Sequence, residues 1–395
     1  MLLGTEQAYA LLGALNFLSK TATGGFFIIT GAAGTGKSFL ISRLYDTLAH
    51  AGAAVTVIAP TGKAATNLRE KNSNLRAMTL HSLLYYVEEV HTPKLDDFGQ
   101  QVYAPDGTKI TIIKRQFKKR DVDSIRSEVD MIIMDEASML QLSNAKFLAQ
   151  LNIPVVLFGD KEQLPPFGEE DFSILSKTPD VHLIDVRRTT MDNAIYKLAY
   201  VIIETGSLFV HDYGHEVEFL SHEEFDVQFL KDNKVDAILS HSNAKRKEAN
   251  DMARAAKGLY RDDLPKLGET IMCLRNHSFP MGKNAYVYMS NGQTVECVQD
   301  AGDCGGKVRL YLPKNVVVTI DKDKFYEDAP YEDDDKHCFC FGYGLTVHKA
   351  QGSEFDAVAV ILPSDYVMTN YMDNIKAWLY TAVTRAKKKL YVVGI

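Results

Sequence analysis

The 395-residue sequence has little that marks a membrane, secreted or zinc-binding protein. No apolar run is long enough to cross a bilayer, and the N-terminus has no basic region followed by a long apolar stretch, so no secretory signal is evident. The five cysteines include no C-x-x-C pair, and reduced structural thiols are their simplest interpretation. Repeats and low-complexity tracts are also missing. We therefore expect a cytoplasmic protein of two or more domains.

An excess of positive charge is missing as well. The net charge is −7 and the pI is near 5.9. These values argue against a protein coated in positive charge for indiscriminate nucleic-acid binding. They are compatible with a local basic groove, because the charge of a whole chain says little about one cleft.

Short apolar runs alternate with helical patterns along most of the chain. Residues 5–20 have apolar side chains at helical spacing, and Thr5 is placed to cap that helix. The apolar runs are short, β-branched and bounded by Gly or Pro, which is typical of strands buried on both faces of a parallel sheet. They comprise residues 26–30, 55–59, 131–134, 155–158, 237–239, 358–362 and 390–393.

Two stretches break this α/β pattern. Residues 86–125 contain Pro93 and a Pro-Asp-Gly turn at 105–107, and residues 293–342 contain several glycines between alternating strands. Both predict β-rich insertions in α/β domains. The acidic stretch 327–335 is most simply a solvated loop.

A phosphate-binding loop is indicated at residues 31–38, which read Gly-Ala-Ala-Gly-Thr-Gly-Lys-Ser. An apolar strand precedes it and an amphipathic helix follows, so backbone N–H groups and a helix N-terminus converge on one point. Lys37 is expected to reach the β- and γ-phosphates of ATP, and Ser38 to ligate Mg²⁺. The residues predicted to line the nucleotide here are Gly31, Ala32, Ala33, Gly34, Thr35, Gly36, Lys37 and Ser38.

Two acidic residues, Asp135 and Glu136, end the apolar run 131–134. The carboxyl end of a buried parallel strand lies at the sheet edge where such folds bind ligands. Asp135 is predicted to hold Mg²⁺ directly or through water, and Glu136 to polarise the attacking water.

Further motifs follow in a fixed order, and together they resemble superfamily 1 helicases. They are Ala-Pro-Thr-Gly-Lys-Ala-Ala at 59–65, Thr-Leu-His-Ser-Leu at 79–83, Gly-Asp-Lys-Glu-Gln-Leu-Pro-Pro at 159–166, Thr-Val-His-Lys-Ala-Gln-Gly-Ser-Glu at 346–354 and Tyr-Thr-Ala-Val-Thr-Arg-Ala at 380–386. The set is most similar to the RecD/Dda-like branch, including small phage Dda helicases. The resemblance runs from Gln7 to Arg385.

The resemblance implies an α/β fold with two RecA-like P-loop ATPase domains, each built on a parallel sheet, at residues 1–190 and 191–395. By position, the insertion at 86–125 corresponds to a β-hairpin that splits the duplex. The insertion at 293–342 corresponds to a small Src-homology-3-like β-barrel.

The resemblance also implies nucleotide-binding roles beyond the loop. Gln7 matches the glutamine that reads adenine, and Gln163 matches the residue that senses the γ-phosphate and coordinates water. Gly352 and Glu354 match a segment that couples the nucleotide to DNA.

Arginines complete the implied site. Arg385 matches an arginine finger from the second domain, and Arg188 matches a second phosphate-binding arginine, with Arg187 as its adjacent alternative. An arginine finger contributes about 10³–10⁵ in rate, so its placement on another domain would require a closed interdomain cleft for hydrolysis.

The implied track for single-stranded DNA crosses both domains. Its hydroxyl, amide and lysine side chains suit sequence-independent binding to phosphates. The matching residues are Pro60, Thr61, Lys63, Thr79, His81, Asn243, Thr346, His348 and Lys349. In the hairpin, Phe98 or Tyr103 is the candidate wedge. The basic residues that follow either touch duplex phosphates or form a solvated face: Lys114, Arg115, Lys118, Lys119 and Arg120.

The implied function is an ATP- and Mg²⁺-dependent DNA helicase that travels 5′-to-3′, in replication, recombination or repair. It would act as a monomer on single-stranded and fork DNA, with a single-strand-binding protein or replication proteins as further candidate partners and no membrane association. A phage-encoded protein would work in the host cytoplasm. The alternative is a translocase that displaces proteins or remodels RNA without opening duplexes. A non-enzymatic binding module or a DNA-independent kinase fits the motif set less well.

Overall fold

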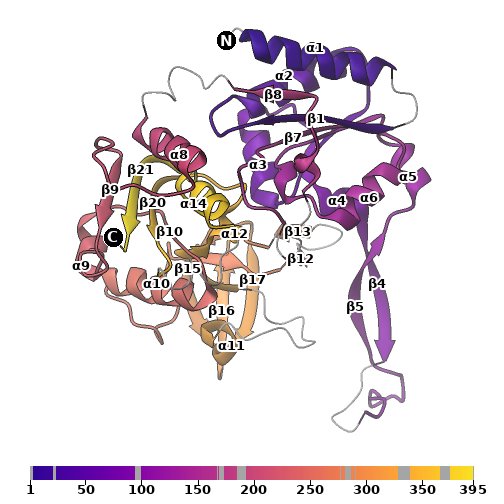
Figure 1. The fold of residues 1–395 in the computed structure, drawn as a ribbon. Coiled ribbons are helices and arrows are strands. Elements are labelled where there is room, and N and C mark those ends of the chain that lie inside the picture. Colours follow the sequence, from indigo (N-terminus) through magenta and orange to yellow (C-terminus); the bar gives the residue numbers. More distant parts are fainter. Residues whose placement is uncertain are drawn as a thin grey trace.

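The fold is described from a computed structural model (Figure 1). The described residues are 3–20, 24–93, 99–166, 168, 173–184, 193–275, 277–280, 286–289, 291–327, 339–364 and 374–394. Several residues singled out above lie outside them, namely Phe98, Arg187, Arg188, Cys338 and residues 328–335 of the acidic stretch.

The first half of the chain forms a six-stranded parallel sheet in the order β3-β2-β6-β7-β1-β8. The predicted strands in this half are confirmed, and the short strands β3 and β8 join them at the two edges. The strands are β1 Gly25–Gly31, β2 Val55–Ala59, β3 Ala77–Thr79, β6 Met131–Met134, β7 Pro154–Gly159 and β8 Val181–Leu183.

Helices cover both faces of this sheet, which explains why its strands are apolar throughout. In β6, Ile133 packs in the cluster of one face while its neighbours Ile132 and Met134 pack in the cluster of the other. The first face carries α1 Thr5–Lys20, α2 Lys37–His50 and α3 Gly62–Lys71; the second carries α4 Leu80–Leu84, α5 Val122–Arg126 and α6 Leu142–Gln150.

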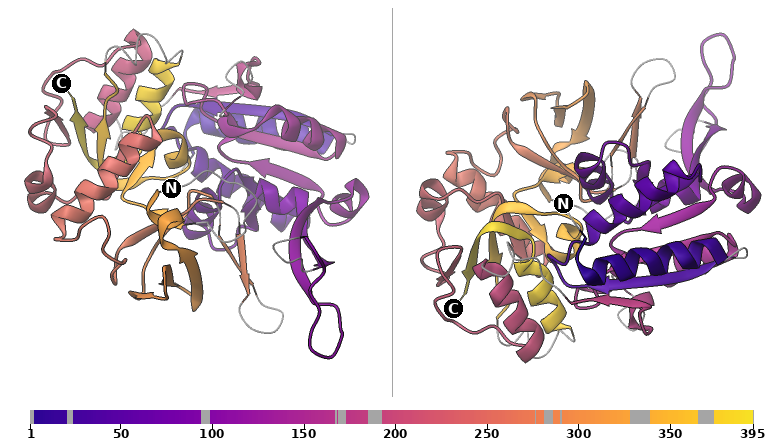
Figure 2. Two further views of the ribbon diagram at one scale, coloured as in Figure 1. Left: turned by 90° about the horizontal axis from the view of Figure 1, so that it is seen from below. Right: turned by 90° about the horizontal axis from the view of Figure 1, so that it is seen from above.

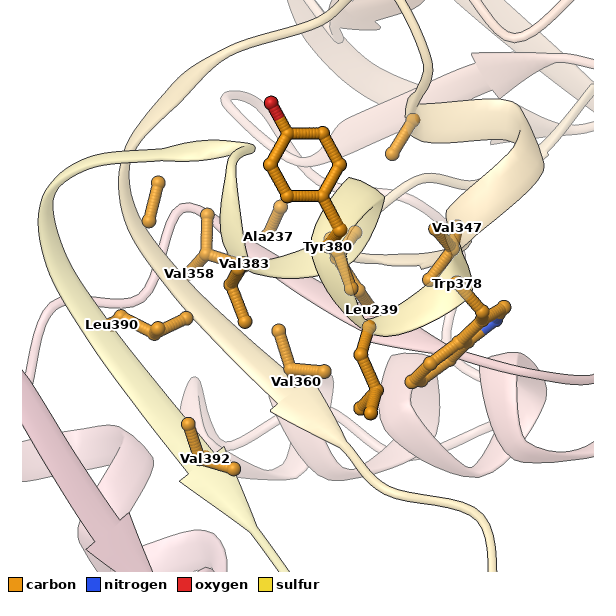
Figure 3. Close-up of a cluster of buried hydrophobic side chains, with 14 of the residues drawn as sticks. Ala237, Leu239, Val347, Val358, Val360, Trp378, Tyr380, Val383, Leu390 and Val392 are labelled. Atoms are coloured by element: carbon orange, nitrogen blue, oxygen red, sulfur yellow. The ribbon is translucent and has the colours of Figure 1, made fainter. Parts of the chain in front are cut away.

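The second half repeats this plan with a five-stranded parallel sheet in the order β19-β10-β20-β21-β9. One face packs against α8 Ala194–Thr205, α12 Val347–Ala350 and α14 Ile375–Val383 in the cluster drawn in Figure 3; the other packs against α9 Val227–Asp232 and α10 Asn243–Ala256. The strands are β9 Val217–Leu220, β10 Ala237–Ser240, β19 Gly344–Thr346, β20 Phe355–Ile361 and β21 Ala386–Val393.

The first predicted insertion contains a β-hairpin, as expected. Strands β4 Tyr85–Pro93 and β5 Thr111–Lys119 pair in antiparallel register and project away from the first sheet (Figures 1 and 2). The predicted bounds of 86–125 extend too far at their end, because Asp121 caps α5 there and returns the chain to the core.

The second predicted insertion is β-rich, but its strands begin before residue 293. Three small antiparallel sheets, β14-β11-β18, β12-β13 and β15-β16-β17, share one apolar cluster with the second parallel sheet. A closed barrel stays a prediction. The elements are β11 Thr270–Cys273, β12 His277–Pro280, β13 Tyr286–Met289, β14 Thr294–Glu296, β15 Gln299–Asp303, β16 Lys307–Leu312, β17 Val316–Asp321, α11 Lys322–Glu327 and β18 Phe339–Phe341.

Three other sequence-based expectations can be placed. The boundary at 190/191 falls among undescribed residues and stays a prediction. Cys273, Cys297, Cys304 and Cys340 are free thiols, and three of them are buried. None of the helices in the described ranges combines the length and apolar character that a bilayer crossing requires.

Candidate nucleotide site and nucleic-acid interface

The loop between β1 and α2 has the geometry of a phosphate cradle. Gly34 and Gly36 both have a φ of 84°, a left-handed conformation in which a side chain would be strained. The Lys37 ammonium donates to the carbonyls of Gly31 at 2.7 Å and Ala32 at 3.0 Å, so it lies across the loop. Backbone N–H groups, a helix N-terminus and an ammonium therefore converge where an anion would bind.

Asp135 and Glu136 follow β6, at the same edge of the sheet as the loop. Asp135 is only 8% exposed, and burial together with the charge of Glu136 raises its pKa to about 7, against the opposing effect of Lys37. Glu136 has a φ of 52°, an uncommon conformation for a residue with a side chain and one that recurs at functional sites.

This donor set fits a magnesium ion. A cation beside Asp135 would offset the desolvation of its carboxylate, and Ser38 borders the same small cavity as Asp135 and Glu136. Across the part of the chain that the structure describes, no three His, Cys, Asp or Glu side chains cluster as a metal site. A Mg²⁺ site needs no such cluster, because proteins usually hold this ion through one or two carboxylates together with phosphates and water.

The nucleotide cavity is built from both halves of the chain. Its volume is about 340 Å³. It is lined by Ala33, Gly34, Gly36, Lys37, Ser38, Phe39, Lys71, Asp135, Glu136 and Gln163 from the first half, and by Tyr196, Glu354, Thr384 and Arg385 from the second. The structure thus brings Lys37 and Arg385, which are 348 positions apart in the sequence numbering, to one cavity.

Arg385 is a buried cation without a carboxylate partner among the described residues. It is 4% exposed, and its guanidinium donates to the carbonyls of Thr381 and Ser353 and to the hydroxyl of Thr384, at 3.0–3.2 Å. Neutral acceptors hold the side chain in place and leave its charge uncompensated. Such a guanidinium favours an anionic ligand in the cavity that it borders.

Gln163 presents a buried acceptor to the same cavity. It is 6% exposed, and its Oε1 atom has no hydrogen-bond partner among the residues that the structure describes. Leaving such a group unsatisfied costs about 1–3 kcal/mol, so a donor such as water is expected there.

Gln7 and the segment 352–354 also lie at the site. Gln7 is buried on α1 and donates from Nε2 to the carbonyl of Thr35 in the loop at 2.9 Å. Gly352 packs against α3, where an added Cβ would lie 3.1 Å from the Cβ of Ala64, and its carbonyl accepts from Asn67 at 3.3 Å. Glu354 borders the cavity itself.

Some site residues were not predicted from sequence. Tyr196 lies on α8, an ordinary amphipathic helix with no motif to mark it, whereas Tyr380 is the first residue of the motif at 380–386. Lys71, at the end of α3, likewise looks like an ordinary surface lysine in the sequence. Arg188 and its alternative Arg187 lie outside the described residues.

Three of the predicted nucleic-acid residues are helix caps at strand ends. The hydroxyls of Thr61, Thr79 and Thr346 accept from the backbone N–H groups of Ala64, Ser82 and Lys349 at 3.0–3.4 Å. Thr61 lies just after β2, and Thr79 and Thr346 are the last residues of β3 and β19. Asn243 begins the helix after β10, so each sheet carries two neighbouring strand ends of this kind. Contact of these strand ends with nucleic acid stays a prediction.

His81 lies at the root of the hairpin. Its ring stacks on Tyr85 at 4.5 Å and meets Phe117 edge-on at 4.6 Å. Burial lowers its pKa, which favours the neutral imidazole and therefore stacking over ion pairing with a phosphate. Burial likewise lowers the pKa of Lys349.

Three of the basic residues at the end of β5 and directly after it form contacts within the protein. Lys118 pairs with Glu88, Arg120 pairs with Glu128, and the Lys119 ammonium lies 3.8 Å from the centre of the Phe147 ring. These contacts favour the interpretation as a solvated face over duplex contacts. Tyr103 is exposed between the two strands of the hairpin; the side chains of Lys114 and Arg115 and all of Phe98 are outside the description.

Two parallel sheets that share a P-loop cavity define a nucleotide-binding α/β protein of the RecA-like type. Comparison with known families agrees: an AAA domain matches residues 13–208, and a UvrD-like helicase C-terminal domain matches residues 341–393. Both matched ranges carry residues of the cavity.

Similar proteins and solved structures indicate which nucleotide-binding proteins this chain resembles. The chain is 26% identical to the ATP-dependent RecD2 DNA helicase of Deinococcus radiodurans, over 95% of this chain and 48% of that protein. It is 25% identical to the RecBCD enzyme subunit RecD of Mycolicibacterium smegmatis, over 94% and 68%. A Pif1 helicase from Bacteroides, solved with ADP-AlF3 and ssDNA, shares the fold with a TM-score of 0.55 at 16% identity, over 99% and 92% of the two chains. The Pif1 helicase from Candida albicans does so with a TM-score of 0.53 at 18% identity, over 100% and 95%.

The chain is therefore similar to the RecD-like helicases of superfamily 1, with the likeness to RecD proteins extending over more than nine-tenths of its length. It spans about half the length of the RecD2 relative and about a third, 36%, of an uncharacterized protein from Methanocaldococcus jannaschii that is 24% identical. A closer kinship with the phage Dda helicases stays a prediction.

Lys63, from the first half, is partly buried against an aromatic ring of the second half. Its ammonium lies 4.1 Å from the centre of the Phe355 ring, and burial, with a smaller effect of Lys387, lowers its pKa to about 8. It also borders a second cavity, of about 760 Å³, between α3, α9, α10 and β14.

Replacing this lysine should alter thermal stability in a pH-dependent way. At neutral pH Lys63 is charged whether the chain is folded or unfolded, and the folded state carries the desolvation cost. As the pH rises through about 8, Lys63 loses its proton in the folded state, and the desolvation cost disappears there. The free energy of unfolding of the wild type should therefore rise by up to about 3 kcal/mol relative to that of Lys63→Met. Melting temperatures between about pH 7 and pH 10 measure this; Lys245→Met, at an exposed site, is the control. A constant difference across the range would contradict the assignment.

Proposed function

We propose that the chain is an ATP-dependent DNA helicase that moves 5′-to-3′ on single-stranded DNA and unwinds duplexes. The observation that carries the proposal is one cavity lined by Lys37, Asp135, Glu136 and Gln163 from one half and by Arg385 from the other. The names of its relatives, a RecD2 DNA helicase and RecD subunits, support the choice of DNA as substrate.

The first half holds the triphosphate. The loop at 31–38 cradles the phosphates, Lys37 reaches the β- and γ-phosphates, and Gln7 reads the adenine. Ser38 and Asp135 are the ligands for Mg²⁺, which when bound neutralises phosphate charge. Glu136 polarises the attacking water and Gln163 orients it.

The second half supplies charge for the transition state. Arg385 stabilises the charge on the γ-phosphate, with Arg188 as a second candidate, while Gly352 and Glu354 connect the site to the DNA track. Because Arg385 reaches the cavity only from the second half, hydrolysis needs the cleft closed. Phosphate release then removes the anion that favours closure, and the cycle of opening and closing moves the DNA strand.

The same proposal assigns the remaining parts. Residues 1–190 and 191–395 are the two motor domains, the hairpin is the wedge, and the loops after β2, β3, β10 and β19 grip single-stranded DNA. The other residues assigned to these DNA contacts are Pro60, Lys63, His81, His348 and Lys349. The active species is a cytoplasmic monomer on single-stranded and fork DNA, with single-strand-binding or replication proteins as partners.

Single substitutions in the cavity should abolish DNA-stimulated ATP hydrolysis. Glu136→Gln should lower kcat at least about 10²-fold and Arg385→Ala about 10³-fold or more, because each removes a group that acts in the transition state. Steady-state ATPase assays with and without single-stranded DNA measure this, with the exposed Glu204→Gln as the matched control. Equal wild-type rates with and without DNA would contradict the proposal.

The direction of travel can be read from tailed duplexes. A helicase moving 5′-to-3′ needs a single-stranded 5′ tail to load, so we expect strand separation of a 5′-tailed duplex and about tenfold less with a 3′ tail of the same sequence. Fluorescent strand displacement with ATP measures both. Preference for the 3′ tail would reverse the assigned polarity.

Shortening the hairpin should uncouple unwinding from translocation. Val90 pairs with Lys114 in its ladder, so replacing residues 91–113 by Asn-Gly keeps the root of the hairpin and its register. This variant should lose most strand displacement while its DNA-stimulated ATPase stays within about threefold of wild type. Retained unwinding would remove the hairpin from the mechanism. A wild type that hydrolyses ATP on DNA and displaces bound protein, yet never separates strands, would instead support the translocase alternative.

A further inference from the structure

Tyr380 joins the two halves of the protein at the nucleotide site. Its ring is buried in the apolar cluster of the second half, only 1% exposed, and Figure 3 shows its hydroxyl pointing away from that cluster. The hydroxyl oxygen accepts from the backbone N–H of Ala33 at 2.9 Å and donates to Oδ2 of Asp160 at 2.6 Å. One hydroxyl therefore links α14, the phosphate-binding loop and the segment that follows β7.

Two further side chains of the second half hold the end of that segment. Thr381 accepts from the backbone N–H of Leu164 at 3.0 Å, and Gln351 donates from Nε2 to the carbonyl of Leu164 at 2.9 Å. Gln163 is thus held between Asp160 and Leu164, both of which are bonded to the other half of the chain.

These bonds are buried and leave few alternatives for their partners. Asp160 is buried, and its other carboxylate oxygen accepts from the backbone N–H of Glu162 at 3.1 Å. Burial and the nearby charge of Asp160 raise the pKa of Tyr380 well above its ordinary value, so its hydroxyl stays protonated and able to donate. If the halves separated, Asp160 and the N–H of Leu164 would each lose a partner supplied by the second half.

We infer that Tyr380 is a positioning residue for ATP hydrolysis, which on cleft closure sets the phosphate-binding loop and, with Thr381 and Gln351, the amide of Gln163. In this inference, which rests on the proposed function, the second half contributes more than the charge of Arg385. It also orients the group that holds the attacking water, so closure assembles both parts of the site together.

Tyr380→Phe tests this by removing one oxygen atom and keeping the ring. We expect kcat for ATP hydrolysis at saturating single-stranded DNA to fall about tenfold or more, while KM for ATP changes less than about threefold. This split is expected because Lys37 and the loop still bind the substrate, whereas Gln163 acts in the transition state. Tyr391→Phe, another buried tyrosine of the second half, is the matched control and should keep kcat within about twofold. A kcat for Tyr380→Phe within about threefold of wild type would overturn the inference.

A double substitution tests the route through Gln163. If Tyr380 acts by placing that amide, Tyr380→Phe should lower kcat less than about threefold further in a Gln163→Ala background. A second fall of about tenfold would show independent effects and overturn the route.

Folding and the proposed function are checked separately. If the melting curve shows that Tyr380→Phe does not fold, Thr381→Val replaces it as the test, because valine has nearly the same shape as threonine. For this variant too we expect kcat to fall about tenfold or more while KM for ATP changes less than about threefold. A wild type without DNA-stimulated hydrolysis would refute the proposed function itself, whereas an active wild type with an unaffected Tyr380→Phe would refute only this inference.

Discussion

Asp135 and Arg385 are two buried groups that carry opposite charges when ionised; they border one cavity from different halves of the chain, and neither forms an ion pair within the described residues. Burial imposes a desolvation cost on each charged form: it raises the pKa of Asp135, and among the described residues the Arg385 guanidinium has only neutral acceptors. A phosphate facing the guanidinium and a cation facing the carboxylate would remove that cost. Two independently packed sheets each carry one of these groups to the cavity.

The two sheets have the same strand order but use opposite edges at the cavity. The first contributes loops after the carboxyl ends of its strands, with the phosphate-binding loop after β1, Asp135 after β6 and Gln163 after β7. The second contributes residues before the amino ends of its strands, with Glu354 before β20 and Arg385 before β21. The carboxyl edge of the second sheet stays available, and it carries Asn243 and Thr346. In the second sheet the edge that borders the nucleotide cavity is therefore distinct from the edge assigned to the nucleic-acid track, whereas the first sheet carries both at its carboxyl edge.

Sequence reasoning succeeded where a pattern is local and failed where a partner is distant. The buried strands, α1, the phosphate-binding loop and the hairpin follow from periodicity and turn chemistry. Tyr196 carried no signal, because its role comes from the meeting of α8 with the first half. Lys118 looked like a free basic residue, yet it pairs with Glu88, which lies on the other strand of the hairpin and is too distant in sequence for a local pattern to show. Edge strands such as β3 and β8 are too short to show a period.

The contacts that hold the cleft closed are weak enough that binding or release of a ligand can shift the cleft between its closed and open states. Besides the Lys63–Phe355 contact, the polar links among the described residues include an ion pair between Lys376 and Glu162. The hydrogen bonds across the cleft include those of Tyr380 with Ala33 and Asp160, of Thr381 and Gln351 with Leu164, and of Asn67 with Gly352. A protein hydrogen bond contributes about 0.5–1.5 kcal/mol net, so this group amounts to a few kcal/mol. Shifting a two-state equilibrium from 1:99 to 99:1 takes about 5.5 kcal/mol of differential binding, which is of the same order. A large apolar interface would hold the halves together whatever the nucleotide, and with no contacts at all Gln163 and Arg385 would lose their alignment. Polar links of this number suit a cleft whose state the nucleotide decides.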